Sequence, residues 1–556
     1  MLTTTLTEQL QSTALLLAEL RQGVIDRRIR PGMANLEQHL PVLLQLDTSS
    51  VHAARLIFQL AQWVDLGWRD ISVVESLLAR VPHQLRSCLT LRDYAAIRAS
   101  EGMVAISHED LDSATRHFDA VLSLREDIED REVLAITFFW KARCQRKRGE
   151  YDKALANTIQ ARDLALECGF DRMAAVMRVL ESWLYFQAGK HKDALAILAE
   201  ADTVLQDTDD AVVLGNIQST YGRVYRQEGR YDRAIVHFSN AIEEYRKIDT
   251  RHPNLARTLA NIAYVKRLVG LDLRRKIDAG LSRKRHAGET ALDPRLPALR
   301  EQFERLRDEA FQHLEEAALI YKVHPNHRGS GTVHLNCGLL HFDNGALDQA
   351  EDEALAAFAL GEEKDDAILR ARARLLQCMV ENAKLEEGIE EDPQRHAEAA
   401  LDYIRDALEF ARTTQNRRLL ARVHTWHGLT LSNEFFSRFD AAVEAMNSAS
   451  AHLDHGFHDT AWEDLRMLKA RVAKSHTIDE TLLAWSQGAV GDRTFREIEE
   501  QFAEILIPKV WQMEGRRIAR VAAKLSISPK KVRRALSRAG LLRTEPGKAG
   551  ASNERS

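Results

Sequence analysis

Residues that interrupt regular structure are scarce in this sequence. Only 27 Gly and 11 Pro occur among 556 residues, which is little punctuation for a sheet protein of this length and favours long helices. No run of 18 uncharged apolar residues occurs, so we expect no membrane-spanning helix. The five cysteines are scattered and form no CxxC pair, which predicts reduced core thiols in a cytoplasmic protein.

Motifs of catalysis and metal binding are also missing. The sequence has no GxxxxGK[ST] phosphate loop, no GxSxG nucleophile elbow and no HExxH zinc motif. His452, His455 and His458 come nearest to a ligand spacing, but on a helix their side chains would not converge on one ion. His424 and His427 are one turn apart with no evident third ligand. We therefore expect no enzyme, metal or cofactor.

Charge is distributed unevenly along the chain. The net charge is −5, from 77 Lys or Arg and 82 Asp or Glu. Residues 515–543 hold ten Lys or Arg and no acid, which leaves 67 basic and 82 acidic residues elsewhere, a net charge of −15. A short basic end on an acidic body is typical of proteins that bind nucleic acid.

One phrase recurs through the middle of the chain. It reads GEYDKALANTIQA from Gly149, GKHKDALAILAEA from Gly189 and GRYDRAIVHFSNA from Gly229, at a spacing of 40 residues. A fourth clear copy, GALDQAEDEALAA, begins at Gly345. Weaker copies place an alanine in the same slot as the clear ones: Ala114, Ala310, Ala400 and Ala442.

Each copy has the features of two helices joined by a tight turn. The glycine tolerates the left-handed conformation that follows the last turn of a helix. Alanines in fixed slots, such as Ala234 and Ala241, let two helices approach closely, and Phe238 fills the remaining space. One such hairpin cannot bury its own apolar face, so neighbouring hairpins must stack into a superhelix.

The phrase resembles the tetratricopeptide repeat, whose consensus contains the pattern G-x-Y-x-x-A…A. The matching residues here are Gly222, Tyr225, Gly229, Tyr231, Ala234, Phe238 and Ala241. The period of 40 is longer than the usual spacing of about 34 in that family. The resemblance covers roughly residues 90–470 and implies an all-α fold, an α-solenoid of about eight helical hairpins. Longer helices of this kind are similar to the repeats of bacterial regulators and peptide-sensing proteins.

Three segments fall outside the regular repeats. Residues 1–90 have helical patterns and are either divergent repeats or a capping bundle. A basic insertion at about residues 271–300 is expected to be an exposed loop or helix extension, with a contact to nucleic acid or an acidic partner as the alternative. Residues 384–393 are acidic and are expected to be solvated surface.

A different unit follows the repeats. We expect a repeat solenoid over 91–473, a linker over 474–493, a DNA-binding domain over 494–543 and a disordered tail over 544–556. Thr494 to Met513 has the pattern of one amphipathic helix. Two short helical segments follow, and Ser528 and Pro529 suit the start of the second one. A basic second helix after a tight turn predicts a helix-turn-helix.

This unit resembles the Fis-type helix-turn-helix family through Ala522, Ala523, Leu525, Ile527, Ser528, Leu536, Gly540 and Leu541. Ser526 stands where that family usually has a turn glycine. Carried over by position, the resemblance implies DNA contacts at Ser528, Lys530, Arg534 and Arg538, to which exposure and charge add Lys531 and Arg533. It also implies a homodimer through the long preceding helix.

The concave side of the repeats offers a second candidate site. Counting back from each hairpin glycine gives a set of groove-facing positions: Arg143, Arg146, Trp183, Phe186, Arg223 and Arg226, and further on Arg257, Tyr264, Arg267, His424 and His427. Arginines with aromatics suit a carboxylate-bearing peptide or protein segment. The alternative is that some arginines pair with acids of neighbouring repeats and set the superhelix.

These observations predict a cytoplasmic transcription regulator. Its solenoid would bind a peptide or protein partner, and its C-terminal helix-turn-helix would bind double-stranded DNA as a homodimer. The competing hypothesis is a repeat scaffold or adaptor without DNA binding, in which the basic C-terminus is only a cap.

Overall fold

The computed structural model of the chain describes residues 2–68, 71–81, 89–287, 295–387, 392–433, 435–453, 460–486, 494–538 and 541, and of residues 2–12, 282–287 and 474–486 the helical backbone alone. These residues form helices and no strand. None of the described helices combines the length and apolarity that a bilayer crossing needs. The chain divides into two compact units, Met1–Val472 and Ala473–Ser556.

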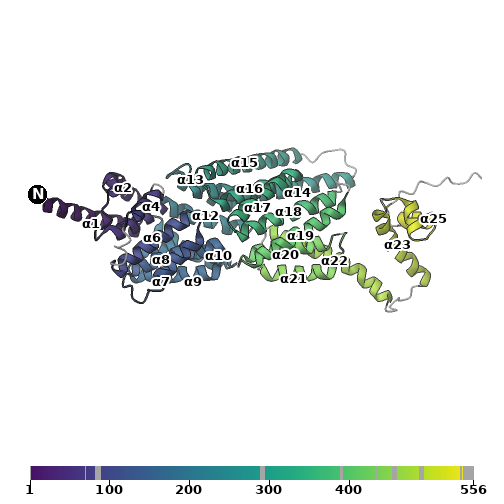
Figure 1. Ribbon diagram of the computed structural model, residues 1–556. Coiled ribbons are helices and arrows are strands. Elements are labelled where there is room, and N and C mark those ends of the chain that lie inside the picture. Colours follow the sequence, from purple (N-terminus) through teal and green to yellow (C-terminus); the bar gives the residue numbers. More distant parts are fainter. Residues whose placement is uncertain are drawn as a thin grey trace, which may run out of the picture. The chain divides into compact units, whose positions relative to one another are not determined.

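In the described part of the first unit, eight consecutive helical hairpins follow one another (Figure 1). They pair α6 Leu91–Ser107 with α7 Leu111–Leu122, α8 Arg131–Arg148 with α9 Tyr151–Glu167, α10 Asp171–Gln187 with α11 His191–Leu205, α12 Ala211–Gln227 with α13 Tyr231–Arg246, α14 Pro253–Ala287 with α15 Leu296–Val323, α16 His327–Asp343 with α17 Leu347–Glu363, α18 Ala367–Glu387 with α19 Pro393–Arg412, and α20 Arg417–Leu431 with α21 Phe439–His452. The predicted all-α solenoid of about eight hairpins is confirmed.

The hairpin turns have the backbone conformation that the glycines predicted. Gly149, Gly189, Gly229 and Gly345 have φ values of 80°, 80°, 73° and 76°. Two weaker copies keep this left-handed conformation without glycine, since Glu109 has φ 62° and Ser437 φ 50° at the matching place. An L side chain in this conformation costs conformational energy. At Glu109 the side chain makes a contact with His327.

The alanine slots are the places of closest helix packing. Ala154, Ala194 and Ala234 are fully buried. A Cβ on Gly222 would lie 2.8 Å from the Phe238 ring of the partner helix. Interiors packed this closely have no spare volume, so the small residues of the repeat are required by the hairpin geometry.

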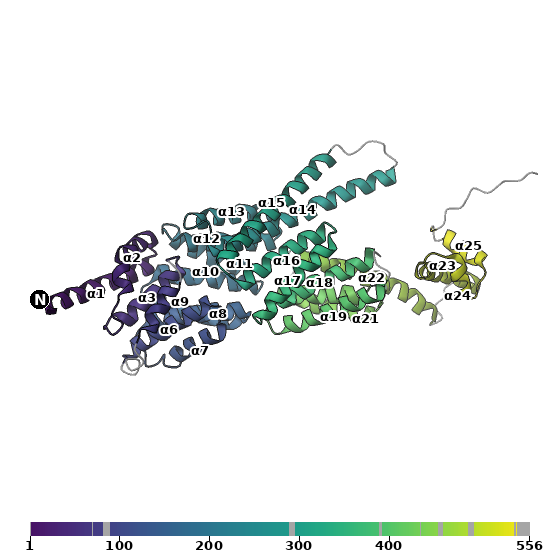
Figure 2. The same ribbon diagram turned by 45° about the horizontal axis from the view of Figure 1, so that its top comes forward.

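The basic insertion is largely a helix extension. Helix α14 continues as far as Ala287, and together with α15 it extends beyond the other hairpins as a long pair (Figure 2). Of the two structures expected for this segment, the helix extension is present up to Ala287. Within the acidic segment, α18 ends at Glu387 and α19 begins at Pro393.

In the part of the chain that the structure describes, four helices precede the first hairpin: α1 Leu2–Asp26, α2 Ile29–Leu44, α3 Ala53–Asp65 and α4 Ser72–Ala79. They share one hydrophobic core with α6 to α10. Trp63 is fully buried and packs against Gly23 and Gly32, and its indole nitrogen donates to the Leu20 carbonyl. These helices are therefore packed as part of the first unit, next to its first hairpins.

Helix α22 Thr460–Ser486 follows the last hairpin, and its start packs into the core of α18 to α21 through Ala461, Leu465 and Leu468. Because α22 continues to Ser486, much of the segment expected as a linker is helical. The second unit then contains α23 Phe495–Met513, α24 Ile518–Lys524 and α25 Pro529–Arg538. The expected tail, 544–556, lies outside the described residues.

A small core joins the three helices of the second unit. Val521 of α24 and Val532 and Leu536 of α25 are fully buried with Ile507 of α23. Ser526, in the turn between α24 and α25, has φ 51°. The backbone here has the conformation that a turn glycine would supply.

Candidate functional site

The concave side of the solenoid contains a cavity of about 830 Å³. Its walls come from the first helices of successive hairpins, α8, α10, α12, α14, α16, α18 and α20, together with Tyr151 of α9, Tyr321 of α15 and the α6–α7 turn. Residues as far apart in the sequence as Glu109 and Arg422 therefore line the same cavity.

The cavity gathers most of the positions expected in the groove. Its lining includes Arg146, Trp183, Phe186, Arg223, Arg226, Arg257 and Tyr264. Arg143 lies instead in an adjoining cavity of about 460 Å³, which shares Arg146, Trp183, Arg223 and Arg257 with the larger one. Counting from the hairpin glycine thus places side chains on the concave face, while their binding role stays a prediction.

Two of the expected groove arginines are committed to ion pairs within the protein. Arg267, buried and outside both cavities, donates from Nε and Nη2 to Asp343 at 2.5 and 2.9 Å. Arg143 forms a two-bond pair with Asp65 at 2.7 and 2.8 Å. These two arginines follow the alternative interpretation, in which arginine–acid pairs set the superhelix.

His424 and His427 line neither cavity. The His424 ring stacks on His452 with 6.0 Å between centroids. His455 and His458 lie outside the described residues. Among the residues that are described, no three His, Cys, Asp or Glu side chains are placed to hold a metal ion.

Five cavity arginines have no carboxylate within 4 Å among the described residues: Arg146, Arg223, Arg257, Arg372 and Arg422. Arg257 donates to the neutral amide oxygen of Asn216 at 3.1 Å, and Arg372 to the Thr332 hydroxyl at 3.4 Å. The Nε groups of Arg257 and Arg422 are buried without a hydrogen-bond partner. Partly buried cations normally have an acid beside them, so the wall carries uncompensated positive charge.

The electrostatics reflect this crowding of like charges. Burial, and then repulsion from Arg257, Arg143 and Arg328, lowers the pKa of Arg146 to about 9. Burial and the neighbouring Arg422 lower the pKa of Arg372 to about 10, and burial with Arg257 and Arg226 lowers that of Arg223 well below its usual value. Guanidinium groups stay protonated near neutral pH, so an anion in this cavity would relieve an unfavourable interaction.

Aromatic rings lie among these charges. Arg146 lies over the Trp183 ring, 5.2 Å from its centroid, and Arg226 over Tyr264 at 5.3 Å. Burial alone would raise the pKa of Tyr264, but Arg422, Arg418 and Arg267 together lower it to about 8. The lowered pKa of Tyr264 follows from the same concentration of arginines around its ring.

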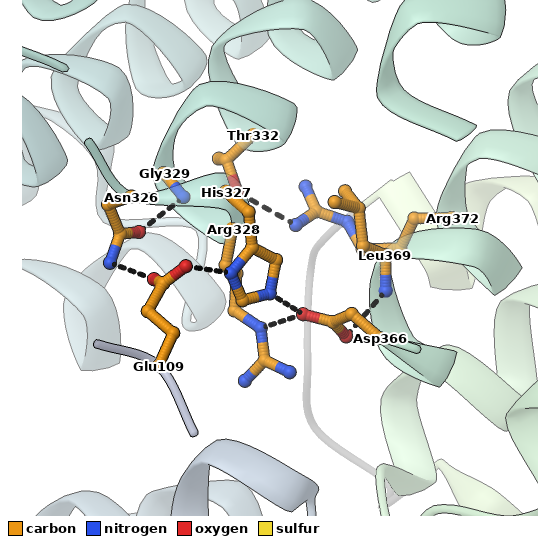
Figure 3. A network of polar contacts seen from close by, with 9 residues as sticks. All are labelled: Glu109, Asn326, His327, Arg328, Gly329, Thr332, Asp366, Leu369 and Arg372. Atoms are coloured by element: carbon orange, nitrogen blue, oxygen red, sulfur yellow. Dashed lines mark hydrogen bonds and ion pairs between the residues drawn. The ribbon is translucent and has the colours of Figure 1, made fainter. Parts of the chain in front are cut away.

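A polar network closes one side of the cavity (Figure 3). Glu109, in the α6–α7 turn, accepts from Asn326 Nδ2 at 3.0 Å and contacts His327 Nδ1 at 2.6 Å. On the other side of the ring, His327 Nε2 lies 3.0 Å from Asp366 Oδ2, which also accepts from Arg328 Nε at 2.5 Å. Because both ring nitrogens face carboxylates, the surroundings favour the protonated form of His327 and raise its pKa.

A second contact joins the same two parts of the arc. The backbone nitrogen of Gln415 donates to the Gly149 carbonyl at 3.1 Å. Its side chain accepts from the backbone nitrogen of Asp152 at 2.8 Å and donates to Oδ2 of Asp152 at 2.9 Å. The turns of the first two hairpins are thus bonded to the segments that begin the last three hairpins, and these contacts border the cavity.

Sequence reasoning missed the cations on the far wall. Arg372 and Arg422 lie on α18 and α20. The count gave no position on α18, and on α20 it gave His424 and His427 instead of Arg422. A signal was present, because each follows a capping residue by six positions: Asp366 and Asn416 accept from the backbone nitrogens of Leu369 and Leu419.

The predicted DNA-contacting residues all lie on or next to α25. Ser528 caps it by accepting from the Lys531 backbone nitrogen at 3.2 Å. Lys530 and Arg533 are exposed and have no carboxylate within 4 Å among the described residues. Lys531, Arg534 and Arg538 are exposed too, but each lies next to a glutamate of α23.

Comparisons with known proteins support the repeat architecture. A sequence profile of the tetratricopeptide repeat family matches residues 213–271, which confirms the resemblance for that part of the chain. No similar sequence is found among curated proteins.

Several solved structures are similar to this chain at low identity. A Rap protein complexed with competence and sporulation factor is 13% identical over 74% of this chain and 99% of its own, with a TM-score of 0.49. The apo quorum sensor NprR from B. thuringiensis is 12% identical over 73% and 100%, at 0.46. The human IFIT1 dimer with m7Gppp-AAAA is 12% identical over 79% and 90%, at 0.45. What this chain binds must therefore follow from its own side chains.

Proposed function

We propose that this protein is a ligand-responsive, DNA-binding transcription regulator. Its solenoid binds a carboxylate-bearing peptide or protein segment in the 830 Å³ cavity, and its C-terminal unit binds duplex DNA as a homodimer. The observation that carries the proposal is the set of five cavity arginines without a carboxylate partner in the described chain. A cytoplasmic location belongs to the same proposal, in line with the four cysteines of the described chain, which form no disulfide there.

The arginines favour an extended anionic ligand. They lie on five different helices of the cavity wall, α8, α12, α14, α18 and α20. Planar guanidinium groups bind carboxylates through two parallel hydrogen bonds. A peptide with several acidic side chains meets such a set of arginines, while Trp183 and Phe186 offer apolar contacts beside it.

The C-terminal unit supports the DNA-binding half of the proposal by its charge and its helix pair. Helices α24 and α25 are joined by a short turn, and α25 exposes Lys530 and Arg533. A capped basic helix of this size suits the major groove of DNA. Ligand binding that changes the pairing of two such units would couple the cavity to DNA affinity.

The ligand half is tested with defined peptides. The full chain and its R223M/R422M variant are titrated with hexaglutamate and, as the matched neutral probe, hexaglutamine. We expect hexaglutamate alone to bind, and the variant to lose that binding. Binding of hexaglutamate that is unchanged in R223M/R422M would show that the cavity is not the site. Preference for oligothymidylate over hexaglutamate, with the same arginine dependence, would make the ligand a nucleic acid.

The DNA half is tested by salt dependence. Binding of mixed-sequence duplex DNA is measured for the full chain and for K530A/R533A/R534A over a salt series. We expect affinity that falls steeply with salt, because cations that neutralise phosphates release counterions, and we expect the variant to lose it. A weak, salt-independent response that is equal in both proteins would favour the repeat scaffold or adaptor with a basic cap.

A further inference from the structure

Helix α23 divides the basic residues of α25 into two groups. Lys531 Nζ lies 2.7 Å from Glu499 Oε1, and Arg538 Nη1 lies 2.7 Å from Glu500 Oε2 and 3.4 Å from Glu504 Oε1. Arg534 Nη2 lies 3.8 Å from Glu500 Oε1. Lys530 and Arg533 have no such neighbour in the described chain.

The division follows from helical geometry. Positions 531, 534 and 538 are spaced i, i+3 and i+7, so they form one stripe of α25, and Lys530 and Arg533 lie one position earlier on another stripe. Glu500 and Glu504 are one turn apart on α23 and face the first stripe. Buried Val532 and Leu536 hold the two helices together, which fixes the stripe beside the glutamates.

A paired cation is a poor phosphate contact. A DNA phosphate that approached Arg538 would have to replace Glu500, whose pKa the Arg538 hydrogen bond already lowers. The unreplaced Glu504 would repel the phosphate at close range. Cations without an acid neighbour carry no such penalty.

Helix α24 and its N-terminal flank supply further cations without an acid neighbour in the described chain; one of them, Arg516, lies over the Trp511 ring, 5.8 Å from its centroid. Arg517 and Arg520 are exposed and have no carboxylate within 4 Å among the described residues, whereas Lys524 pairs with Glu514 at 2.5 Å. Resting on the proposed DNA binding, we infer that the phosphate-contacting surface consists of Arg517, Arg520, Lys530 and Arg533. Lys531, Arg534 and Arg538 instead hold α25 against α23.

Two variants with the same loss of charge test this assignment. K530Q/R533Q and R534Q/R538Q each remove two positive charges from α25 of the full chain, and duplex DNA binding is measured over a salt series. We expect K530Q/R533Q to lower affinity about tenfold or more and to reduce the log–log salt slope by about two, as for two lost phosphate contacts. R534Q/R538Q is expected to keep the wild-type slope.

A third variant guards against a folding effect in R534Q/R538Q. E499Q/K531Q removes an exposed pair at constant net charge, and exposed pairs contribute little to stability. We expect its DNA affinity to stay within about twofold of wild type, whereas loss equal to that of K530Q/R533Q would overturn the assignment. The assignment would also be overturned if K530Q/R533Q and R534Q/R538Q reduced the salt slope of DNA binding equally. A wild-type chain without salt-dependent binding would instead disprove the proposed function.

Discussion

His327 Nδ1 lies 2.6 Å from Glu109 Oε2, although the two residues are 218 positions apart in the chain. The contact joins the turn of the first hairpin to the start of the sixth, across the opening of the arc. Asp366 binds the other ring nitrogen and ties in the seventh hairpin. Closure of the arc therefore rests on the His327 contacts together with those of Gln415 to Gly149 and Asp152.

This contact predicts a stability that depends on pH. Burial alone would lower the pKa of His327, but hydrogen bonds with Asp366 and Glu109 raise it above the ordinary 6.5. A raised pKa in the folded state contributes stability that is fully present below the unfolded pKa and is lost as pH rises through the folded pKa. The pKa values of Glu109 and Asp366 are lowered despite burial, chiefly through His327, so their contribution is lost in acid.

We expect the free energy of unfolding of H327Q to be lower than that of wild type by about 1–3 kcal/mol near pH 6, the value of a hydrogen bond to a charged group. The difference should shrink toward pH 9, where Arg328 still holds Asp366. Chemical denaturation from pH 5 to pH 9 measures it. The matched control is H334Q, because His334 on the same helix lies 2.6 Å from Glu353 and, within the described chain, near no other carboxylate, and its side chain is 39% exposed. A pH-independent difference, or an equal one in H334Q, would contradict the closure.

The sequence predicted the hairpins well because their turns are local. Gly149, Gly189 and Gly229 mark places where the backbone must be left-handed, and a single residue type reports that requirement. Closure of the arc depends on the angles between eight hairpins, which no local pattern encodes. For this reason the contacts of Glu109 with His327 could not be foreseen.

The cavity arginines without an acid partner in the described chain predict that a variant lacking one of them is more stable without ligand but binds an acidic peptide less tightly. Arg223 has like charges around it and no acid within 4 Å in the described chain, whereas Arg267 is buried in a two-bond pair with Asp343. Replacing Arg223 with Met keeps much of the apolar stem and removes repulsion, so the R223M chain without ligand should unfold at a higher temperature. R267M leaves Asp343 buried without its partner and should cost about 3–5 kcal/mol.

Thermal unfolding of both variants without ligand, with hexaglutamate titration alongside, checks this opposition. R223M should be more stable than wild type and bind the peptide less tightly. A loss of stability in R223M as large as that in R267M would mean that Arg223 acts as a structural cation.

The contact between Gly222 and Phe238 in the fourth hairpin predicts that position 222 accepts no side chain larger than that of glycine. A Cβ on Gly222 would meet the Phe238 ring at 2.8 Å, and this ring is fully buried with no room to move. We expect G222A to lose roughly 1–3 kcal/mol of unfolding free energy, as overpacked cores do. G270A is the control, because its Cβ would lie 3.6 Å from Phe303. That variant should be unchanged or gain up to about 1 kcal/mol from helix propensity.

The candidate DNA surface was predictable only in part. Capping by Ser528 and burial of Val532 and Leu536 follow from spacing within one helix, and both are present. Arg538 pairs with Glu500 on another helix, and the two residues are 38 positions apart in the sequence. Counting positive charge along the chain could not reveal which cations were already neutralised.

The exposed face of α23 predicts where the proposed homodimer forms. Phe495 is 83% exposed and Phe502 43%, and they are two turns apart on one face of the helix. Large apolar side chains that stay uncovered within a chain often mark an interface. We expect F495E/F502E to convert a dimeric full-length chain to monomer and to weaken DNA binding, with V236E on an exposed site of α13 as the matched control. Sedimentation equilibrium measures the mass, and a dimer that persists in F495E/F502E would place the interface in the repeats.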